Sequence, residues 1–347
     1  MVEGCFLGGI EGVAVSIGAE LLRRLPGQNK KQCEGIALLV STALSVCSVN
    51  LNELASALPR RAERLDMRYQ WISRVLGNDL IDVDTVMAPF AREVLARAAT
   101  GGRRVVLMID QSQANEGHQI LMVSLRLGGR ALPLAWRTRR AKGTLSFAVQ
   151  EEVLEVVAGL LGEGVSVLLM GDRFYGSPAL IGWCREQGWG WRLRCKESLI
   201  VLDANGEETT LGACFARGER LLSEVLVTRK HALTNVAMFQ GEGHKAPWII
   251  AMSDTPTVER AAEYRQRWGI EAMFSDYKTR GFNLEASQIE RTDRLDRLVM
   301  ILSLALYWAV STGMWDAVEN PRPAEKKPLE QDAGTSREAS THGSSEG

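Results

Sequence analysis

The spacing of apolar residues predicts that the N-terminal part of the chain is helical. Up to about residue 98, apolar positions recur near a period of 3.6, as in Ile36–Val46, and polar breaks precede Leu51–Leu58 and Arg60–Leu76. Residues 48–76 resemble three short helices of helix-turn-helix size, and the last of them carries five arginines: Arg60, Arg61, Arg64, Arg68 and Arg74. A helical bundle with a solvated arginine face would give the same pattern, so this segment does not establish DNA binding by itself.

The pattern changes to that of a mixed α/β sheet after Gly101-Gly102. Apolar runs predict a buried strand at 105–110 and a hairpin of strands at 119–127 and 131–136 around Gly128-Gly129. An amphipathic helix at 145–161 and a second buried strand at 165–172 follow. Because a crossover helix joins the two buried strands, we expect them to run parallel. The carboxyl ends of those strands carry Asp110 and Asp172, which then lie side by side at one sheet edge.

The remaining segments complete the predicted domain order. A helix at 177–187 and a strand at 189–196 extend the sheet, residues 197–252 read as a β-rich insertion, and Thr255-Pro256 predicts the start of a helix that carries Glu271. Residues 320–347 are rich in Pro, Glu, Lys, Ser and Gly, which predicts a disordered tail. The predicted parts are a helical DNA-binding domain at 1–98, a core at 99–196 and 253–319, the insertion and the tail.

Composition changes this interpretation little, but the charge distribution matters. The 347 residues are 46% hydrophobic and 24% charged, with 41 basic and 42 acidic residues and a formal net charge of -1. Residues 23–74 hold nine basic and four acidic residues, and residues 101–150 hold eight and two, so these blocks are net +5 and +6. Local potential governs attraction to a polyanion, so a nucleic acid partner is compatible with the neutral total.

Other sequence features favour a cytoplasmic protein without a membrane span. The six cysteines form no C-x2-C pair and indicate neither a structural zinc site nor a disulfide framework. The N-terminus lacks the basic region of a signal peptide. The apolar run Leu298–Val310 is thirteen residues long, short of the roughly 20 that span a bilayer, and it predicts a buried helix.

Three acidic residues from separate segments are the candidate catalytic group. Asp110, Asp172 and Glu271 would bring two strand ends and one helix face together. Carboxylates with few histidines suit hard, oxygen-preferring ions such as Mg²⁺, for which Mn²⁺ would substitute. Two such ions would support in-line transfer at a phosphodiester. Each acid taken alone has a structural alternative: Asp110 could cap the loop after its strand, Asp172 could cap the following helix or pair with Arg173, and Glu271 could be a surface residue.

The basic residues around Glu271 strengthen this hypothesis. Tyr264, Arg267, Glu271 and Lys278 follow the spacing Y-x2-R-x3-E-x6-K. At about 100° per residue, a helix would place all four on one face. Such a face suits a metal-bound phosphodiester better than a simple salt bridge.

Over about residues 100 to 310, the chain resembles the DDE transposases of bacterial insertion sequences, in the subgroup with a Tyr-Arg-Glu-Lys signature. The matching segments are LMIDQSQ around Asp110, LLMGDRFYGSPALIGW around Asp172, and YRQRWGIEAMFSDYK with the following GFNLE. The resemblance implies a ribonuclease H-like core with a β-rich insertion. It also implies that Asp110, Asp172 and Glu271 of this core bind two Mg²⁺ ions. It also implies strand cleavage at terminal inverted repeats and strand transfer into target DNA.

The resemblance further implies roles for residues near the cut. Tyr264, Arg267 and Lys278 would hold DNA phosphates, and Trp248 would stack on a base flipped out of the duplex. A core tryptophan in a strand is the alternative for Trp248. Trp268 points away from the signature face and is read as packing. The expected partners are double-stranded DNA of the transposon ends and target, and a second copy of the chain when assembled on DNA.

Two other functions fit parts of the sequence. One is a transposase-derived DNA-binding protein that recognises ends but no longer cuts, against which the three intact acids argue. The other is a ribonuclease H-like nuclease with a cellular role, which the full signature makes a poorer fit. For the transposase, we expect a bacterial cytoplasmic protein that acts at the nucleoid.

Overall fold

The computed structural model describes residues 9–60, 64–202, 206–227, 232–241, 246–278 and 280–320. The chain divides into one compact unit that ends at Trp308 and a second unit that begins at Ala309. Arg61 and residues 321–347 of the predicted tail lie outside the described residues.

The N-terminal part is helical, as the periodicity predicts. Its helices are α1 (Gly9–Arg24), α2 (Lys30–Val46), α3 (Leu51–Ala57), α4 (Leu65–Leu76) and α5 (Val83–Ala99). Side chains of Asn29, Asn50 and Asp82 accept hydrogen bonds from the first turns of α2, α3 and α5, which explains where these helices begin. The described part of 48–76 holds two helices, α3 and α4, where three were expected.

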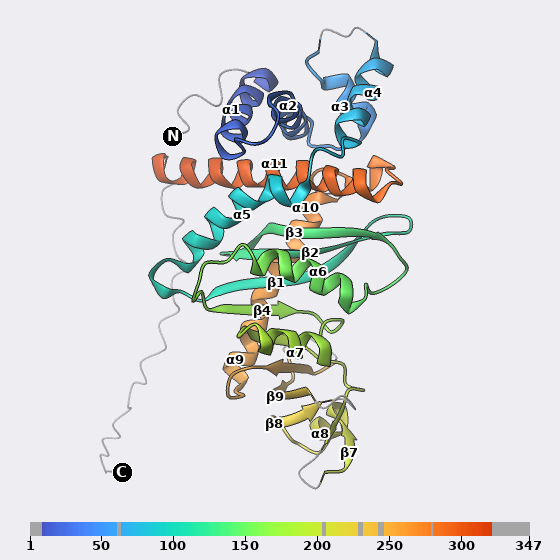
Figure 1. Cartoon of the computed structure of the whole chain (residues 1–347). Helices are drawn as coiled ribbons and strands as arrows, with labels where there is room; N and C mark the ends of the chain where they lie inside the picture. Colours follow the sequence, from blue (N-terminus) through green and yellow to red (C-terminus); the bar gives the residue numbers. More distant parts are fainter. Residues whose placement is uncertain are drawn as a thin grey trace, which may run out of the picture. The chain divides into compact units, whose positions relative to one another are not determined.

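A single ten-stranded mixed sheet forms the centre of the first unit (Figure 1). Its order is β3-β2-β1-β4-β5-β10-β9-β8-β6-β7. The first five in chain order are β1 (Val105–Asn115), β2 (His118–Leu127), β3 (Arg130–Arg140), β4 (Val167–Gly171) and β5 (Gly190–Arg194). As expected, β1 runs parallel to β4, and β4 to β5, whereas β1, β2 and β3 form an antiparallel meander. This arrangement is compatible with a ribonuclease H-like core.

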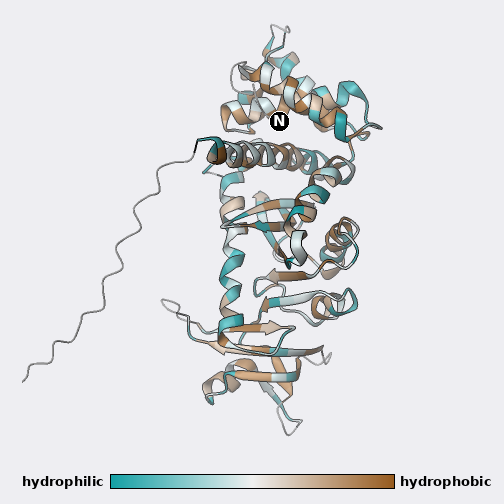
Figure 2. Ribbon diagram, turned by 90° about the vertical axis from the view of Figure 1, so that its left-hand side faces the viewer, coloured by the Kyte–Doolittle hydropathy of each residue, from teal (hydrophilic) through white to brown (hydrophobic). Residues whose placement is uncertain are grey.

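The β-rich segment after β5 extends the same sheet. It comprises β6 (Ile200–Leu202), β7 (Glu208–Thr210), β8 (Leu221–Val227), β9 (Ala232–Phe239), β10 (Trp248–Met252) and a short helix α8 (Leu211–Ala216) that the sequence did not predict. β10 pairs with both β5 and β9 and so joins the two halves of the sheet. Most strand segments carry hydrophobic colouring in Figure 2.

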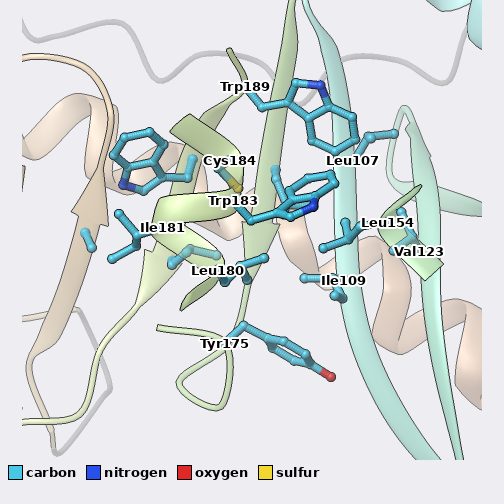
Figure 3. Packing of buried hydrophobic residues seen from close by; sticks show 14 of the residues in the cluster. Leu107, Ile109, Val123, Leu154, Tyr175, Leu180, Ile181, Trp183, Cys184 and Trp189 are labelled. Carbon is cyan, nitrogen blue, oxygen red and sulfur yellow. The ribbon is translucent and has the colours of Figure 1, made fainter. Parts of the chain in front are cut away.

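Helices cover both faces of the sheet. α6 (Phe147–Ala158) and α7 (Pro178–Glu186) pack on one face, where Leu154, Leu180 and Trp183 meet Leu107, Ile109 and Val123 in one apolar cluster (Figure 3). The alternation of β10 sends Ile249 and Ala251 into this cluster and Trp248, Ile250 and Met252 to the other face. On that second face lie α9 (Val258–Ala262), a 3₁₀ segment η2 (Glu263–Arg267) and α10 (Trp268–Tyr277).

The apolar run near the end of the described chain belongs to a longer helix than expected. α11 (Thr292–Glu319) lies along the edge strand β3 in its first part, where Tyr307 donates to the Pro133 carbonyl. Among the described residues, α11 is long and apolar enough to cross a bilayer, and α2 with α3 would also qualify if counted as one span bent by 99°. Of the apolar window in α11, 56% is buried, as in a core helix of a folded domain.

Candidate active site

The register of two parallel strands brings Asp110 and Asp172 together. The last paired residues of β1 and β4 are Ile109 and Gly171, and the two aspartates come directly after them. Neighbouring strands lie about 4.8 Å apart, so the two side chains start from adjacent positions. Asp110 does not end its strand, however, because β1 continues to Asn115 along β2 and Asp110 faces Met122 in that pairing.

A tight turn fixes the position of Asp172 after β4. Its carboxylate accepts a hydrogen bond of 2.8 Å from the Phe174 amide, and its carbonyl accepts one of 2.9 Å from Tyr175. A Cβ added to Gly176 would lie 2.5 Å from the Arg194 carbonyl oxygen. The turn therefore depends on glycine to pass close to β5. Ser177, and not Asp172, caps the following helix.

Arg267 connects two of the candidate acids. Its guanidinium donates to Asp110 Oδ2 at 2.8 Å and also forms a hydrogen-bonded ion pair with Glu271. The Arg267 side chain is only 8% exposed, whereas that of Glu271 is 55% exposed. A buried cation thus lies between an acid on β1 and an acid at the solvent-facing side of α10.

The electrostatics show that Asp172 belongs to the same neighbourhood. Desolvation raises the pKa of Asp110 to about 6; Arg267 opposes this rise, and the charges of Asp172 and Glu271 add to it. Burial lowers the pKa of Arg267, but Tyr264 and the charges of the three acids outweigh it, so the net shift is upward. The three predicted acids and Arg267 therefore share one electrostatic site.

The donor set fits a hard divalent cation, but the acids are not arranged around an ion. Asp110, Asp172 and Glu271 offer only carboxylate oxygens, which Mg²⁺ and Mn²⁺ prefer. Within the described ranges, no group of three or more acidic, histidine or cysteine side chains stands ready to hold a metal. Arg267 would have to release Glu271 before the three carboxylates could share a cation.

The signature segment is not the single helix that its spacing predicted. Thr257 caps α9, and the expected start at Thr255-Pro256 is wrong by two residues. Residues 263–267 then form a 3₁₀ turn, so the assumed rotation of 100° per residue does not hold across the segment. Lys278 ends α10 in a non-helical conformation and pairs with Glu285 at 3.4 Å, apart from the contacts of Arg267.

Trp248, expected to contact DNA, is buried, and Trp268, expected to pack inside the protein, is exposed. Trp248 packs with Phe239 and Tyr264. Trp248 and Tyr264 are each 2% exposed, so DNA has no access to these two residues in this structure. Trp268, predicted to serve as packing, is 50% exposed, and its ring centroid lies 6.5 Å from that of Trp248. Trp268 therefore offers accessible aromatic surface on the signature segment, and Phe174, which is 45% exposed, offers more beside Asp172.

Of the described arginines that were predicted to bind DNA, Arg60 and Arg64 lie in the connection between α3 and α4, Arg68 lies on α4, and all three have partners within the protein. Arg60 lies over the Trp71 ring at 4.5 Å, and Arg64 pairs with Asp66 at 2.7 Å. Arg68 donates to the Ser56 carbonyl at 3.3 Å. Arg60 and Arg64 are also solvent exposed, so both remain accessible to a polyanion.

Tyr175 is a site residue that the sequence reasoning missed. Its hydroxyl is buried without a hydrogen-bond partner in the described part of the chain, and it points away from the labelled apolar side chains in Figure 3. Its pKa is raised by desolvation first and then by the charges of Asp110 and Asp172. The signal available in the sequence was its place three residues after Asp172, in the turn GDRFYGS.

Comparison with known proteins agrees with the site. Residues 150–308 match the family model for the transposase DDE domain. This range includes Asp172, Glu271 and the whole signature segment, whereas Asp110 lies before it. No curated protein matches the chain. Over residues 150–308 the chain is thus similar to the transposase DDE domain, which indicates a transposase-type enzyme.

Proposed function

We propose that this protein cleaves DNA at the ends of a mobile element and joins the freed 3′ ends to target DNA, as a transposase of the Tyr-Arg-Glu-Lys subgroup. The observation that carries the proposal is the contact of Arg267 with both Asp110 and Glu271, next to Asp172. It brings acids that are far apart in the sequence into one site of the kind that phosphodiester transfer requires. The family match over residues 150–308 supports the same reaction class.

In this proposal Asp110, Asp172 and Glu271 hold Mg²⁺, or Mn²⁺ in its place. When bound, a pair of such ions activates the attacking oxygen and stabilises the leaving oxygen of an in-line displacement. Asp110 and Asp172 are fixed by the sheet and the turn after β4, whereas Glu271 lies on α10 and is more exposed. Glu271 is therefore the ligand that can adjust as DNA enters.

Arg267 has two successive roles in this scheme. Without DNA, its charge offsets the repulsion among carboxylates that are partly removed from water. Once the carboxylates hold cations, the same guanidinium is free to bind a phosphate next to the cut through its planar fork of donors. Lys278 adds a second positive charge beyond the end of α10.

The experiment uses purified protein and labelled duplexes from the DNA that flanks the coding sequence. With Mg²⁺, we expect nicks at the element ends and products joined to a target plasmid, and neither with EDTA. Asp172→Asn and Glu271→Gln should each abolish both products while gel-shift binding persists. Binding without nicking would identify an inactive DNA-binding protein, and cleavage without joined products would identify a nuclease.

A further inference from the structure

A cavity lined by both polar and apolar side chains lies outside the acidic site, between the N-terminal helices and the start of α11. It encloses about 220 Å³ and is lined on one side by Tyr69 and Ser73 of α4. The other side is formed by the segment that includes Ser287, Glu290 and Arg294. None of these residues takes part in the site formed by the three carboxylates.

Two polar groups in the wall of this cavity have no partner among the residues that the structure describes. Ser287 is 4% exposed, and its hydroxyl is buried without a hydrogen bond to them. Arg294 Nε is likewise buried and unbonded, and the guanidinium makes no ion pair with the described residues. A Cβ added to Gly77 would lie 3.3 Å from Arg294 Nε and Nη2, which places this guanidinium against the end of α4. Buried polar groups normally have partners, so this pair indicates a missing ligand.

The charges around the cavity favour an anion. Asp293 already pairs with Arg291 at 2.9 Å and with Arg297 at 3.3 Å, and Arg297 also holds Asp79 at 3.0 Å. Both of these acids are thus engaged by other arginines, and Arg294 is left over. Glu290 lines the cavity but is solvent exposed, and within the described chain it forms no ion pair with Arg294.

We propose that this cavity binds one backbone phosphate of DNA, with the Arg294 guanidinium and the Ser287 hydroxyl as its donors. The inference depends on the proposed function, because it names a contact between the same substrate and a different part of the chain. DNA is favoured over a free anion because α4, which forms one wall, also carries Arg68 and Arg74 and follows directly after Arg64. A bound phosphate there would fix the duplex to α4 and α11 at once.

The test measures binding of a fluorescent 30-base-pair duplex by anisotropy over a range of KCl concentrations. The slope of log Kd against log salt counts released counterions, about 0.9 per phosphate contacted. Arg294→Gln should lower this slope by about 1 and weaken binding about tenfold near 0.1 M salt. Ser287→Ala, which removes no charge, should weaken binding a few-fold and leave the slope unchanged.

Arg97→Gln is the matched control, because it removes the same charge from a side chain that is 75% exposed on α5. The melting temperature without DNA separates binding from structure. If Arg294 serves only to bind the phosphate, Arg294→Gln should melt at or above the wild-type temperature. A lower melting temperature with an unchanged salt slope would show a structural role and overturn the proposal.

The two proposals fail in different ways. A wild-type slope for Arg294→Gln, or a change no larger than that of Arg97→Gln, refutes the phosphate site and leaves the transposase proposal intact. If the wild-type protein binds no DNA even at low salt, both proposals are refuted.

Discussion

At the residue scale, the charge balance of the site depends on Arg267. It is the buried cation that contacts both Asp110 and Glu271, and its charge opposes the upward pKa shift that desolvation causes in Asp110. A cation that bridges two carboxylates also competes with metal for them. Removal of Arg267 should therefore have opposite effects on metal binding and on DNA chemistry.

Arg267→Gln should bind Mn²⁺ more tightly than the wild type, by several-fold in calorimetric titration, because the competing charge is gone. The same variant should cleave DNA at least 100-fold more slowly, since it cannot hold a phosphate through a charged fork. Arg265→Gln is the control, because Arg265 is exposed in the same segment and contacts none of the three acids. Weaker Mn²⁺ binding by Arg267→Gln would contradict the competition.

Asp110 should make the metal-free protein less stable as the pH rises. The folded-state pKa is about 6 against an ordinary value of 3.8, so the native state binds more protons than the unfolded state between these values. The stabilisation from the neutral acid is complete below about pH 4 and is lost as the pH passes 6, by up to about 3 kcal/mol. Urea unfolding of wild type and Asp110→Asn with EDTA, from pH 4 to 8, measures this.

The Asp110→Asn variant should lose this part of the pH dependence. Asp296, whose pKa burial also raises to about 6, contributes a similar trend that the variant keeps. An identical pH profile for the two proteins would contradict the assignment to Asp110.

At the element scale, the turn after β4 and the signature segment position the site. The turn packs so closely against β5 that Gly176 has no room for a side chain. The signature segment crosses the second face of the sheet as α9, η2 and α10, so the acid on α10 reaches the strands from that side (Figure 1).

Gly176→Ala should destabilise the protein and displace Asp172, because the new Cβ would meet the Arg194 carbonyl. We expect the free energy of unfolding to fall by about 2 to 3 kcal/mol. The rate of DNA cleavage should fall as well, even under conditions in which the variant is fully folded, because Asp172 is displaced. Gly182→Ala in α7 is the matched control, since a Cβ there meets nothing within 4 Å. It should be neutral or stabilising by up to about 1 kcal/mol. Equal stability of both variants would contradict this role of Gly176.

Local patterns in the sequence predicted most of this architecture. Alternating and continuous apolar runs located β1 to β5, α6 and α7, because burial on a sheet face imposes those patterns, but β1 and β3 continue to Asn115 and Arg140, past their predicted ends at 110 and 136. Chain order and crossover geometry then predicted that Asp110 and Asp172 are neighbours. The 3₁₀ turn at 263–267 was not predicted, because a spacing of residues does not distinguish 3₁₀ from α-helix.

Long-range contacts set the features that the sequence did not reveal. The order of exposure of Trp248 and Trp268 depends on packing against Phe239 and Tyr264, which no local period encodes. The sequence predicts a phosphate contact for Arg267 but not its contact with Asp110, because the two residues are 157 positions apart. Arg137 on β3 likewise pairs with residues far from it in the sequence, Asp84 and Glu152.

At the scale of the whole molecule, the N-terminal helices and the sheet are joined through α11. Arg297 is buried and donates to the carbonyls of Leu76 and Ile81 at the ends of the α4–α5 connection, and it pairs with Asp79. Asn50, which caps α3, donates to the Ala286 carbonyl after the signature segment. These contacts predict that the helices and the core of the first unit unfold together.

Arg297→Met should lower the free energy of unfolding by about 3 kcal/mol, because the carbonyls of Leu76 and Ile81 and the carboxylates of Asp79 and Asp293 lose a charged donor. One cooperative transition in calorimetry is expected for the wild type. Arg291→Met is the control, since Arg291 is 61% exposed and pairs only with Asp293 among the described residues. Arg297→Met as stable as this control would contradict the coupling.

The proposed chemistry requires that Asp110, Asp172 and Glu271 together bind divalent metal. Fe²⁺ in place of Mg²⁺, with ascorbate and peroxide, generates hydroxyl radicals that cut the polypeptide next to the bound ion. We expect cuts near residues 110, 172 and 271 in the same protein, suppressed by excess Mg²⁺ and absent in Asp172→Asn. Cuts confined to other positions, or cuts at only one of the three, would contradict it.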